Sequence, residues 1–209
     1  EMFPADPVGI GMLLAPLGLA AGPAVPTREW RELYGALDCA AVAAIHPFYK
    51  ASIREFEAAG RSIVGSAPVG CDGTADWLDA IGTACGVARR TIDAAKNAAL
   101  PAIRGALAAS PIRGRVTLSG YEGSELLVGR LLVESGADLR YVGTACPQTP
   151  WSEPDRAWLE ARGVADAPGA FIPRVTYGEY LRELLDAALL AHPDRLQLVR
   201  DEVEDLDFA

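Results

Sequence analysis

Residues 39–64 read CAAVAAIHPFYKASIREFEAAGRSIV, and they indicate the class of fold. Residues 39–45 form a continuous run of small apolar side chains, which is typical of a strand buried on both faces of a sheet. Residues 48–59 have the spacing of a helix that ends at Gly60, and residues 61–64 form a second strand. Strand, helix and strand in this order predict a parallel sheet with helices packed on it.

The same order of elements returns in the second half of the chain. Residues 115–119 (RVTLS) and 139–143 are predicted strands, and residues 124–135 are the helix between them. A further helix starts at Ser152, with Asp155 at the spacing of a capping box. We therefore expect an α/β fold of two Rossmann-like parallel units joined by long helices and followed by a short helix–strand tail.

Glycine and proline divide the remaining sequence into segments. Residues 6–17 predict a weak helix, and Thr27 is expected to cap a helix that ends at Leu37. Residues 65–74 are rich in Gly and Pro and predict an irregular loop, and a helical region with one break follows over residues 75–109. The expected organisation is a first Rossmann-like unit (1–75), a helical connector (76–112), an incomplete second Rossmann-like unit (113–163) and an acidic tail (164–209) with a helix at 177–191 and a strand at 196–203.

The composition excludes several classes of protein. The chain has 209 residues, half of them apolar, with a formal net charge of −9. The apolar fraction argues against a disordered chain, and the acidic balance argues against binding nucleic acid through its phosphates. No uninterrupted apolar stretch is long enough to span a membrane, and Glu1 and Asp6 stand where a secretory signal would be basic. We expect a cytoplasmic protein and, because residue 1 is not Met, a piece of a longer one.

Four cysteines, at positions 39, 71, 85 and 146, and two histidines are spread along the chain. No CxxC pair occurs, whereas zinc and iron–sulfur sites need clustered sulfur or imidazole ligands. We therefore predict no metal site within this chain, and we interpret the cysteines as buried thiols of a reducing compartment.

Three loops follow predicted strands, and parallel α/β sheets bind their ligands at that edge. His46 follows the first strand and is a candidate proton donor or ring contact, with a satisfied loop histidine as the alternative. Asp72 in the second loop is a candidate general acid, with a turn or cap role as the alternative. The turn at residues 119–124 presents backbone N–H groups to a ligand, or is an ordinary turn in which Ser119 and Glu122 cap the next helix.

Long strings of the sequence resemble a known family. They are EMFPADPVGIGMLLAPLGLAAGP (1–23), PTREWRELYGALDCA (26–40), AAIHPFYKASIREFEAAGR (43–61), GSAPVGCDGTADWLDAIG (65–82) and GRVTLSGYEGSELLVGRLLVESGADLRYVGTACPQTPWS (114–152). In unbroken order over residues 1–163 they resemble the Y-subunit family of chlorophyllide a reductases, which are nitrogenase-like oxidoreductases of bacteriochlorophyll synthesis. The resemblance implies a nitrogenase component 1-like fold of several Rossmann-like domains.

The resemblance further implies a fragment of the catalytic component of such a reductase, inactive by itself. In that family the Y subunit pairs with a Z-type subunit in a heterotetramer, and an ATP-dependent iron–sulfur reductase subunit supplies electrons. The C7=C8 bond of ring B of chlorophyllide a is reduced. A [4Fe–4S] cluster belongs to the full complex, but its cysteine ligands lie in a domain that this chain does not contain, so we assign it none of the four cysteines.

A flat apolar macrocycle needs an apolar pocket with few polar anchors. The strand-end loops could form the wall of such a pocket, because their residues are small or aromatic and few of them are charged. The expected substrate contacts are Pro47, Phe48, Tyr49, Pro68, Gly120 and Tyr121. His46 and Asp72 are the expected catalytic proton donors, since protons must accompany the electrons that reach the ring.

The resemblance ends near Gly163. The tail, residues 169–209, resembles a segment of FAD/NAD(P)-binding proteins through the string FIPRVTYGEYL (171–181), although the glycine-rich fingerprint of those proteins is absent. A truncated or fused chain and a divergent C-terminus of the same family are the two interpretations of this tail. The alternative functions are therefore an FAD- or NAD(P)-binding module and a non-catalytic α/β interaction domain.

Overall fold

The computed structural model describes residues 6–46, 49–168 and 174–198. Its contacts divide the chain into two compact units, Glu1–Phe171 and Ile172–Ala209. The first unit is a mixed α/β structure with two small parallel sheets. In the described part of the second unit, the regular element is the helix α8 (Arg174–Ala191), which confirms the predicted helix at 177–191.

The first sheet confirms the parallel pair predicted from residues 39–64. Strands β1 (Ala41–Ala44) and β2 (Ser62–Gly65) pair in parallel, and α3 (Lys50–Ala58) connects them. The prediction that the first strand is buried on both faces was wrong, because Ala43 is exposed and Ala44 alone is fully buried. Ala43 borders an open cavity instead of a packed layer.

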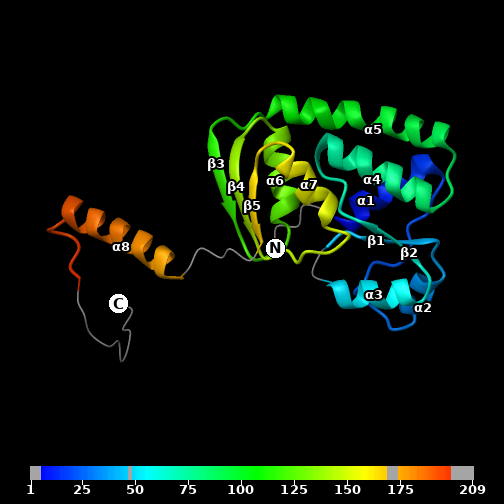
Figure 1. Ribbon diagram of the computed structural model, residues 1–209, viewed down its shortest axis with the longest axis horizontal. Helices are drawn as coiled ribbons and strands as arrows, with labels where there is room; N and C mark the ends of the chain where they lie inside the picture. Colours follow the sequence, from blue (N-terminus) through cyan, green and yellow to red (C-terminus); the bar gives the residue numbers. More distant parts are fainter. Residues whose placement is uncertain (1–5, 47–48, 169–173, 199–209) are drawn as a thin grey trace. The chain divides into compact units, whose positions relative to one another are not determined.

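The second sheet has three parallel strands in chain order. Both predicted strands and the helix between them are confirmed, and Figure 1 shows α6 and α7 on the same side of this sheet. A third strand, β5, was not predicted and extends the sheet into residues assigned to the acidic tail. The elements are β3 (Arg115–Ser119), α6 (Glu125–Glu134), β4 (Asp138–Thr144), α7 (Glu153–Glu160) and β5 (Ala165–Pro168).

Two long helices, α4 (Gly70–Ala84) and α5 (Arg89–Ala109), lie between the sheets in sequence and pack against each other. The predicted break between them is confirmed, and α5 continues through Pro101. Helix α4 begins within the stretch predicted to be an irregular loop, so that prediction was wrong for residues 70–74. The early start is possible because Gly70 adopts a left-handed φ of 70° and the side chain of Glu134 accepts hydrogen bonds from the first-turn amides.

The amino-terminal segment forms α1 (Pro7–Leu14), a 3-10 turn η1 (Ala15–Leu17) and α2 (Glu32–Leu37). Asp6 caps α1, since its carboxylate accepts hydrogen bonds from two first-turn amides. The expected cap at Thr27 was wrong, because α2 begins four residues later than predicted. In the predicted strand at 196–203, residues 196–198 belong to no strand, and the rest lies outside the described residues.

Two apolar clusters hold the first unit together. Trp77, Leu78 and Ile92 centre the larger one between α4, α5 and the first sheet, and Leu126, Val142 and Leu159 centre the other under the second sheet. Within the described ranges, no helix is long and apolar enough to cross a membrane.

Candidate functional site

Residues at the strand ends of both sheets line one small cavity, although the sequence predicted a ligand crevice at such ends. Ile45 after β1, Ser66 after β2, Gly123 after β3 and Cys146 after β4 line a cavity of about 20 Å³. That volume holds about one water molecule. The crevice is closed partly by Trp151, whose backbone lies so close to Gly65 that a Cβ there would approach it to 2.5 Å. A macrocycle cannot enter here.

A buried ion pair adjoins this small cavity, because one of the lining residues, Asp155, pairs with Arg130. Arg130 of α6 is 2% exposed and donates to Asp155 of α7 at 2.7 Å and to Asp76 of α4 at 3.0 Å. The hydroxyl of Ser66 donates to the same Asp155 oxygen at 2.9 Å. Burial raises the pKa of the Asp155 carboxyl, and Arg130 acts in the opposite direction. The network therefore joins α4, α6, α7 and the end of β2.

The capping box predicted from Ser152 and Asp155 is not formed. Ser152 is the N-cap residue of α7, but its side chain makes no cap bond and donates to the Pro147 carbonyl at 2.8 Å. The Asp155 carboxylate instead accepts a hydrogen bond from the Arg130 guanidinium. Sequence spacing alone offered no signal for this pairing, because the partners of Asp155 lie 25 and 89 residues away along the chain.

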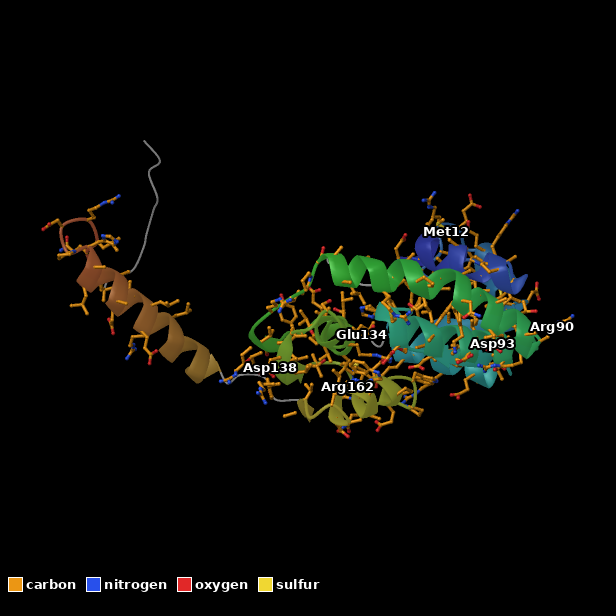
Figure 2. The ribbon with its side chains drawn as sticks, turned by 90° about the horizontal axis from the view of Figure 1, so that it is seen from above. Met12, Arg90, Asp93, Glu134, Asp138 and Arg162 are labelled. Atoms are coloured by element: carbon orange, nitrogen blue, oxygen red, sulfur yellow. The ribbon has the colours of Figure 1, made fainter. Side chains whose placement is uncertain are left out.

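Asp72, an expected proton donor, belongs to a different cluster on the surface. Its carboxylate accepts hydrogen bonds from the Trp158 indole at 3.1 Å and from Arg162 at 3.0 Å. The Arg162 guanidinium stacks on the Trp158 ring, 3.5 Å from its centroid. Figure 2 shows Arg162 at the side of the first unit. Asp72 thus pairs with a surface cation and faces neither cavity.

Backbone amides beside two helix N-termini, where an anion could bind, are already bonded to carboxylates of this chain. In the turn before α6, Glu125 accepts hydrogen bonds from the amides of Glu122 and Gly123 and from the Thr144 hydroxyl. The alternative in which Ser119 and Glu122 cap α6 is therefore not what the structure shows. At α4, Glu134 (labelled in Figure 2) accepts from the first-turn amides. These sites do not fit the pyrophosphate of FAD or NAD(P).

The large cavity of the first unit lies beside β1, with a volume of about 510 Å³. His46 and Tyr49 both line it, and their rings are 5.3 Å apart. The rest of its wall comes mainly from residues 19–26, from residues 39–45, which include β1, and from parts of α1, α3 and α4. No sequence pattern singled out residues 19–26, because small residues in a loop carry no periodicity that predicts a wall.

The other predicted contacts do not join His46 and Tyr49. Among described residues, Pro68, Gly120 and Tyr121 line neither this cavity nor the small one, and Tyr121 is 69% exposed. Pro47 and Phe48 lie outside the described residues. The structure therefore brings together two of the predicted site residues.

A family model described as nitrogenase component 1 type oxidoreductase matches residues 1–196. The chain belongs to this family. It is 74% identical over 163 residues to the chlorophyllide reductase 52.5 kDa chain of Cereibacter sphaeroides, and 69% identical over 164 residues to the protein of the same name from Rhodobacter capsulatus. Each match covers 78% of this chain and 32% or 33% of the relative. The chain spans about a third of the length of these curated relatives.

Membership of the nitrogenase component 1 type family bears on the tail. The family match runs past Gly163 and through α8 to residue 196. This extent favours the interpretation of a divergent C-terminal part of the same family over a segment of a flavoprotein.

Nitrogenase component 1 type oxidoreductases typically work with an iron–sulfur cluster, and the four cysteines of this chain lie at separate places in the described structure. No group of three or more metal-ligating side chains occurs among the residues with described positions. Cys39 and Cys85 line the large cavity, Cys71 lies in the first turn of α4, and Cys146 is buried. Burial raises the pKa of the Cys85 thiol, and the nearby Cys39 adds to this effect.

Proposed function

We propose that this chain is part of the catalytic component of a chlorophyllide a reductase located in the cytoplasm. The reaction adds two electrons and two protons across the C7=C8 bond of ring B of chlorophyllide a. An ATP-dependent iron–sulfur reductase subunit supplies the electrons, and a Z-type subunit completes the component. The complex holds a [4Fe–4S] cluster, to which we assign no residue of this chain. The supporting observation is the 74% identity with a chlorophyllide reductase chain.

Within this proposal, His46 is the proton donor that this chain contributes. It lines the large apolar cavity together with Tyr49, and a proton donor must lie within hydrogen-bond reach of the carbon that it protonates. We no longer propose Asp72 for this role, since its carboxylate is held by Trp158 and Arg162 away from that cavity. Tyr49 is the proposed ring contact.

Titration with chlorophyllide a tests the proposal. The purified chain is titrated with and without a co-expressed Z-type subunit, and binding is followed by pigment absorbance and fluorescence quenching. Saturable binding in the presence of the partner is the expected result. A His46→Gln variant is expected to bind the pigment and, in the complete reductase, to lose turnover. Failure to bind chlorophyllide a under both conditions would contradict the proposal.

Dinucleotide binding is the weaker candidate, because Glu125 already accepts from the turn amides before α6 and Glu134 from the first-turn amides of α4. We expect the chain to show no flavin absorbance after incubation with FAD and gel filtration.

A further inference from the structure

We propose that the free edge of β1 pairs with an extended, uncharged segment of another polypeptide, which enters the 510 Å³ cavity as a further strand of the sheet. This interaction goes beyond the proposed function, because it involves a polypeptide partner and requires neither pigment nor electrons. It is also compatible with that function. His46 lies beyond the carboxyl end of β1, so a strand beside β1 leaves it at the sheet edge where parallel α/β proteins bind ligands.

The cavity lies at the edge of β1 and not over one of its faces. Side chains of a strand alternate between the two faces of a sheet, so a space over one face is lined by every second residue. Here every residue from 39 to 46 lines the cavity, whereas none of the described residues of β2 does. The space therefore borders the β1 backbone on the side away from β2.

Helices enclose this space on two sides, as they enclose the sheet itself. Figure 1 shows α1 and α4 on one side of β1 and β2, and α2 and α3 on the other side. All four of these helices contribute residues to the cavity lining, and residues 19–26 supply a further wall. The space thus continues the layer of the sheet past β1, which is where a layered α/β structure places its next strand.

The backbone of β1 has hydrogen-bonding groups available at this edge. An edge strand presents a row of unpaired N–H and C=O groups that can bind another strand. Among the described residues, the backbone groups of Ala41–Ala44 have no hydrogen-bond partner outside β2. A peptide added there would form main-chain hydrogen bonds, which provide the affinity when a strand adds to a sheet.

The sequence of β1 is that of an inner strand. Proteins usually protect an edge strand with charged side chains or proline. Residues 39–45 contain neither and form a continuous run of small apolar side chains, which is typical of a strand buried inside a parallel sheet. The structure leaves this run at an edge, with Ala43 exposed. An added strand would give β1 the surroundings that its sequence predicts.

The walls of the cavity define the chemistry of the incoming segment. Its described lining contains no Asp, Glu, Lys or Arg, so a charged side chain there would lose its hydration without gaining an opposite charge. Helices α1 and α4 contribute Ile10 and Ile81, and α3 contributes Ile53 and Phe56. Because the side chains of an added strand point to both sides, we expect an uninterrupted apolar run of about five residues.

The curated relatives are long enough to supply such a segment. About two-thirds of each relative lies outside the region that matches this chain. A second copy of the chain is a poor source, because the edge of β1 lies between helices of both layers and two copies could not bring these edges together. The occupant is therefore an apolar strand from a different stretch of polypeptide.

A synthetic peptide tests the pairing. The probe is acetyl-Ala-Val-Ile-Val-Ala-Lys-Lys-amide, an apolar run with two lysines for solubility. Its matched control carries N-methyl groups on the Val-Ile-Val amides, so it keeps the side chains and loses the main-chain donors. Binding of each peptide to the full chain is measured by isothermal titration calorimetry. We expect the control to bind about tenfold more weakly, because it lacks those hydrogen bonds.

Hydrogen exchange locates the bound peptide. At ten times its Kd the probe leaves about a tenth of the chain free, so exchange should slow about tenfold at the β1 amides that face the cavity. Strand β3 is the control within the chain, since it too lies at the edge of a sheet but none of its described residues lines the cavity. Equal protection of β3 and β1, equal binding of the two peptides, or no binding of the probe would each overturn the proposal.

Two neighbouring proline variants test the edge in the chain itself. Adjacent strand residues direct their amides to opposite edges, so one of Val42→Pro and Ala43→Pro removes a donor to β2 and the other removes a donor to the cavity. The variant that keeps the melting midpoint of the unmodified chain is expected to bind the probe about fivefold more weakly. Undiminished binding by that variant would overturn the proposal. If both variants misfold, the N-methyl peptide still decides the question.

The outcomes separate this inference from the proposed function. If chlorophyllide a shields the β1 amides and the probe does not, the strand is overturned and the reductase is supported. If the probe shields these amides and chlorophyllide a binds under no condition, the strand is supported and the reductase is contradicted. Protection of β1 that rises with the concentration of the chain alone would overturn the proposal in favour of a second copy.

Discussion

Arg130 shows how one buried side chain connects distant parts of the chain. It reaches an acid on α7 and another on α4, and its guanidinium lies 4.8 Å from the centroid of the Trp158 ring. Asp155 is 4% exposed in its side chain, whereas Asp76 is 68% exposed. The two acids therefore contact the same cation in different surroundings. Removing a buried partner leaves an uncompensated charge, but removing an exposed one is offset by water.

We predict that Asp155→Ala lowers the free energy of unfolding by about 3–5 kcal/mol, because Arg130 stays buried without its closest partner. Asp76→Ala is the matched control and should cost at most about 1 kcal/mol, since that acid is exposed. Urea denaturation followed by tryptophan fluorescence measures both. Equal losses for the two variants would contradict this account of the network.

Cys146 gives a prediction on pH. Burial raises the pKa of its thiol to about 11 from 9.0. Between these values the unfolded thiol loses its proton while the folded one keeps it, so stability falls as the pH rises through this window. Urea denaturation from pH 8 to pH 11 should show a steeper loss for the unmodified chain than for Cys146→Ala. Parallel profiles would show that Cys146 is not responsible.

Among the helices, α4 depends on a side chain from another helix for its first turn. Glu134 at the end of α6 accepts hydrogen bonds from the amides of Cys71 and Asp72. A carboxylate near a helix N-terminus also interacts favourably with the helix dipole. This contact couples α6 to α4, whose residues Trp77 and Ile81 line the large cavity.

We predict that Glu134→Ala lowers stability by about 1–2 kcal/mol, the usual cost of losing a helix cap. Hydrogen exchange should speed up at the Cys71 and Asp72 amides, which lose their acceptor. Glu160→Ala, at an exposed position of α7, is the control and should change neither quantity. Unchanged exchange in Glu134→Ala would mean that water or another group caps α4.

For the chain as a whole, the two units differ in what supports them. The first contains both sheets and both apolar clusters. The described helix of the second is α8, whose Leu181, Leu184, Leu185 and Leu190 are 41–83% exposed. A single helix gains little stability without a packed apolar face.

A chain that ends at Phe171 is therefore expected to keep the cooperative melting transition and the midpoint of the full chain. Near-ultraviolet circular dichroism measures this, because the four tryptophans of the protein all lie before that residue. A clear drop in the midpoint would show that residues 172–209 contribute to the stability of the first unit.

Local patterns were sufficient for most of the parallel architecture. Short apolar runs between helices predicted four of the strands, because these patterns span only a few residues. The strands are at residues 41–44, 62–65, 115–119 and 138–144. Strand β5 was not predicted from the sequence because its residues, ADAP, are not typical of a strand. Its extended conformation depends on pairing with β4. His46 was placed after its strand by the same local signals.

Tertiary packing determined the site. The strand ends were expected to hold the ligand, but only about 20 Å³ remains there, beside an Asp155 whose partners come from 25 and 89 residues away. The large cavity is lined by residues 19–26 together with residues of β1 and α4, a juxtaposition that no local pattern encodes. Sequence periodicity specifies which segments become helices and strands, since backbone hydrogen bonds and local side chains control that choice. Which polar groups pair, and where space remains, depends on side chains that meet only after the segments have packed.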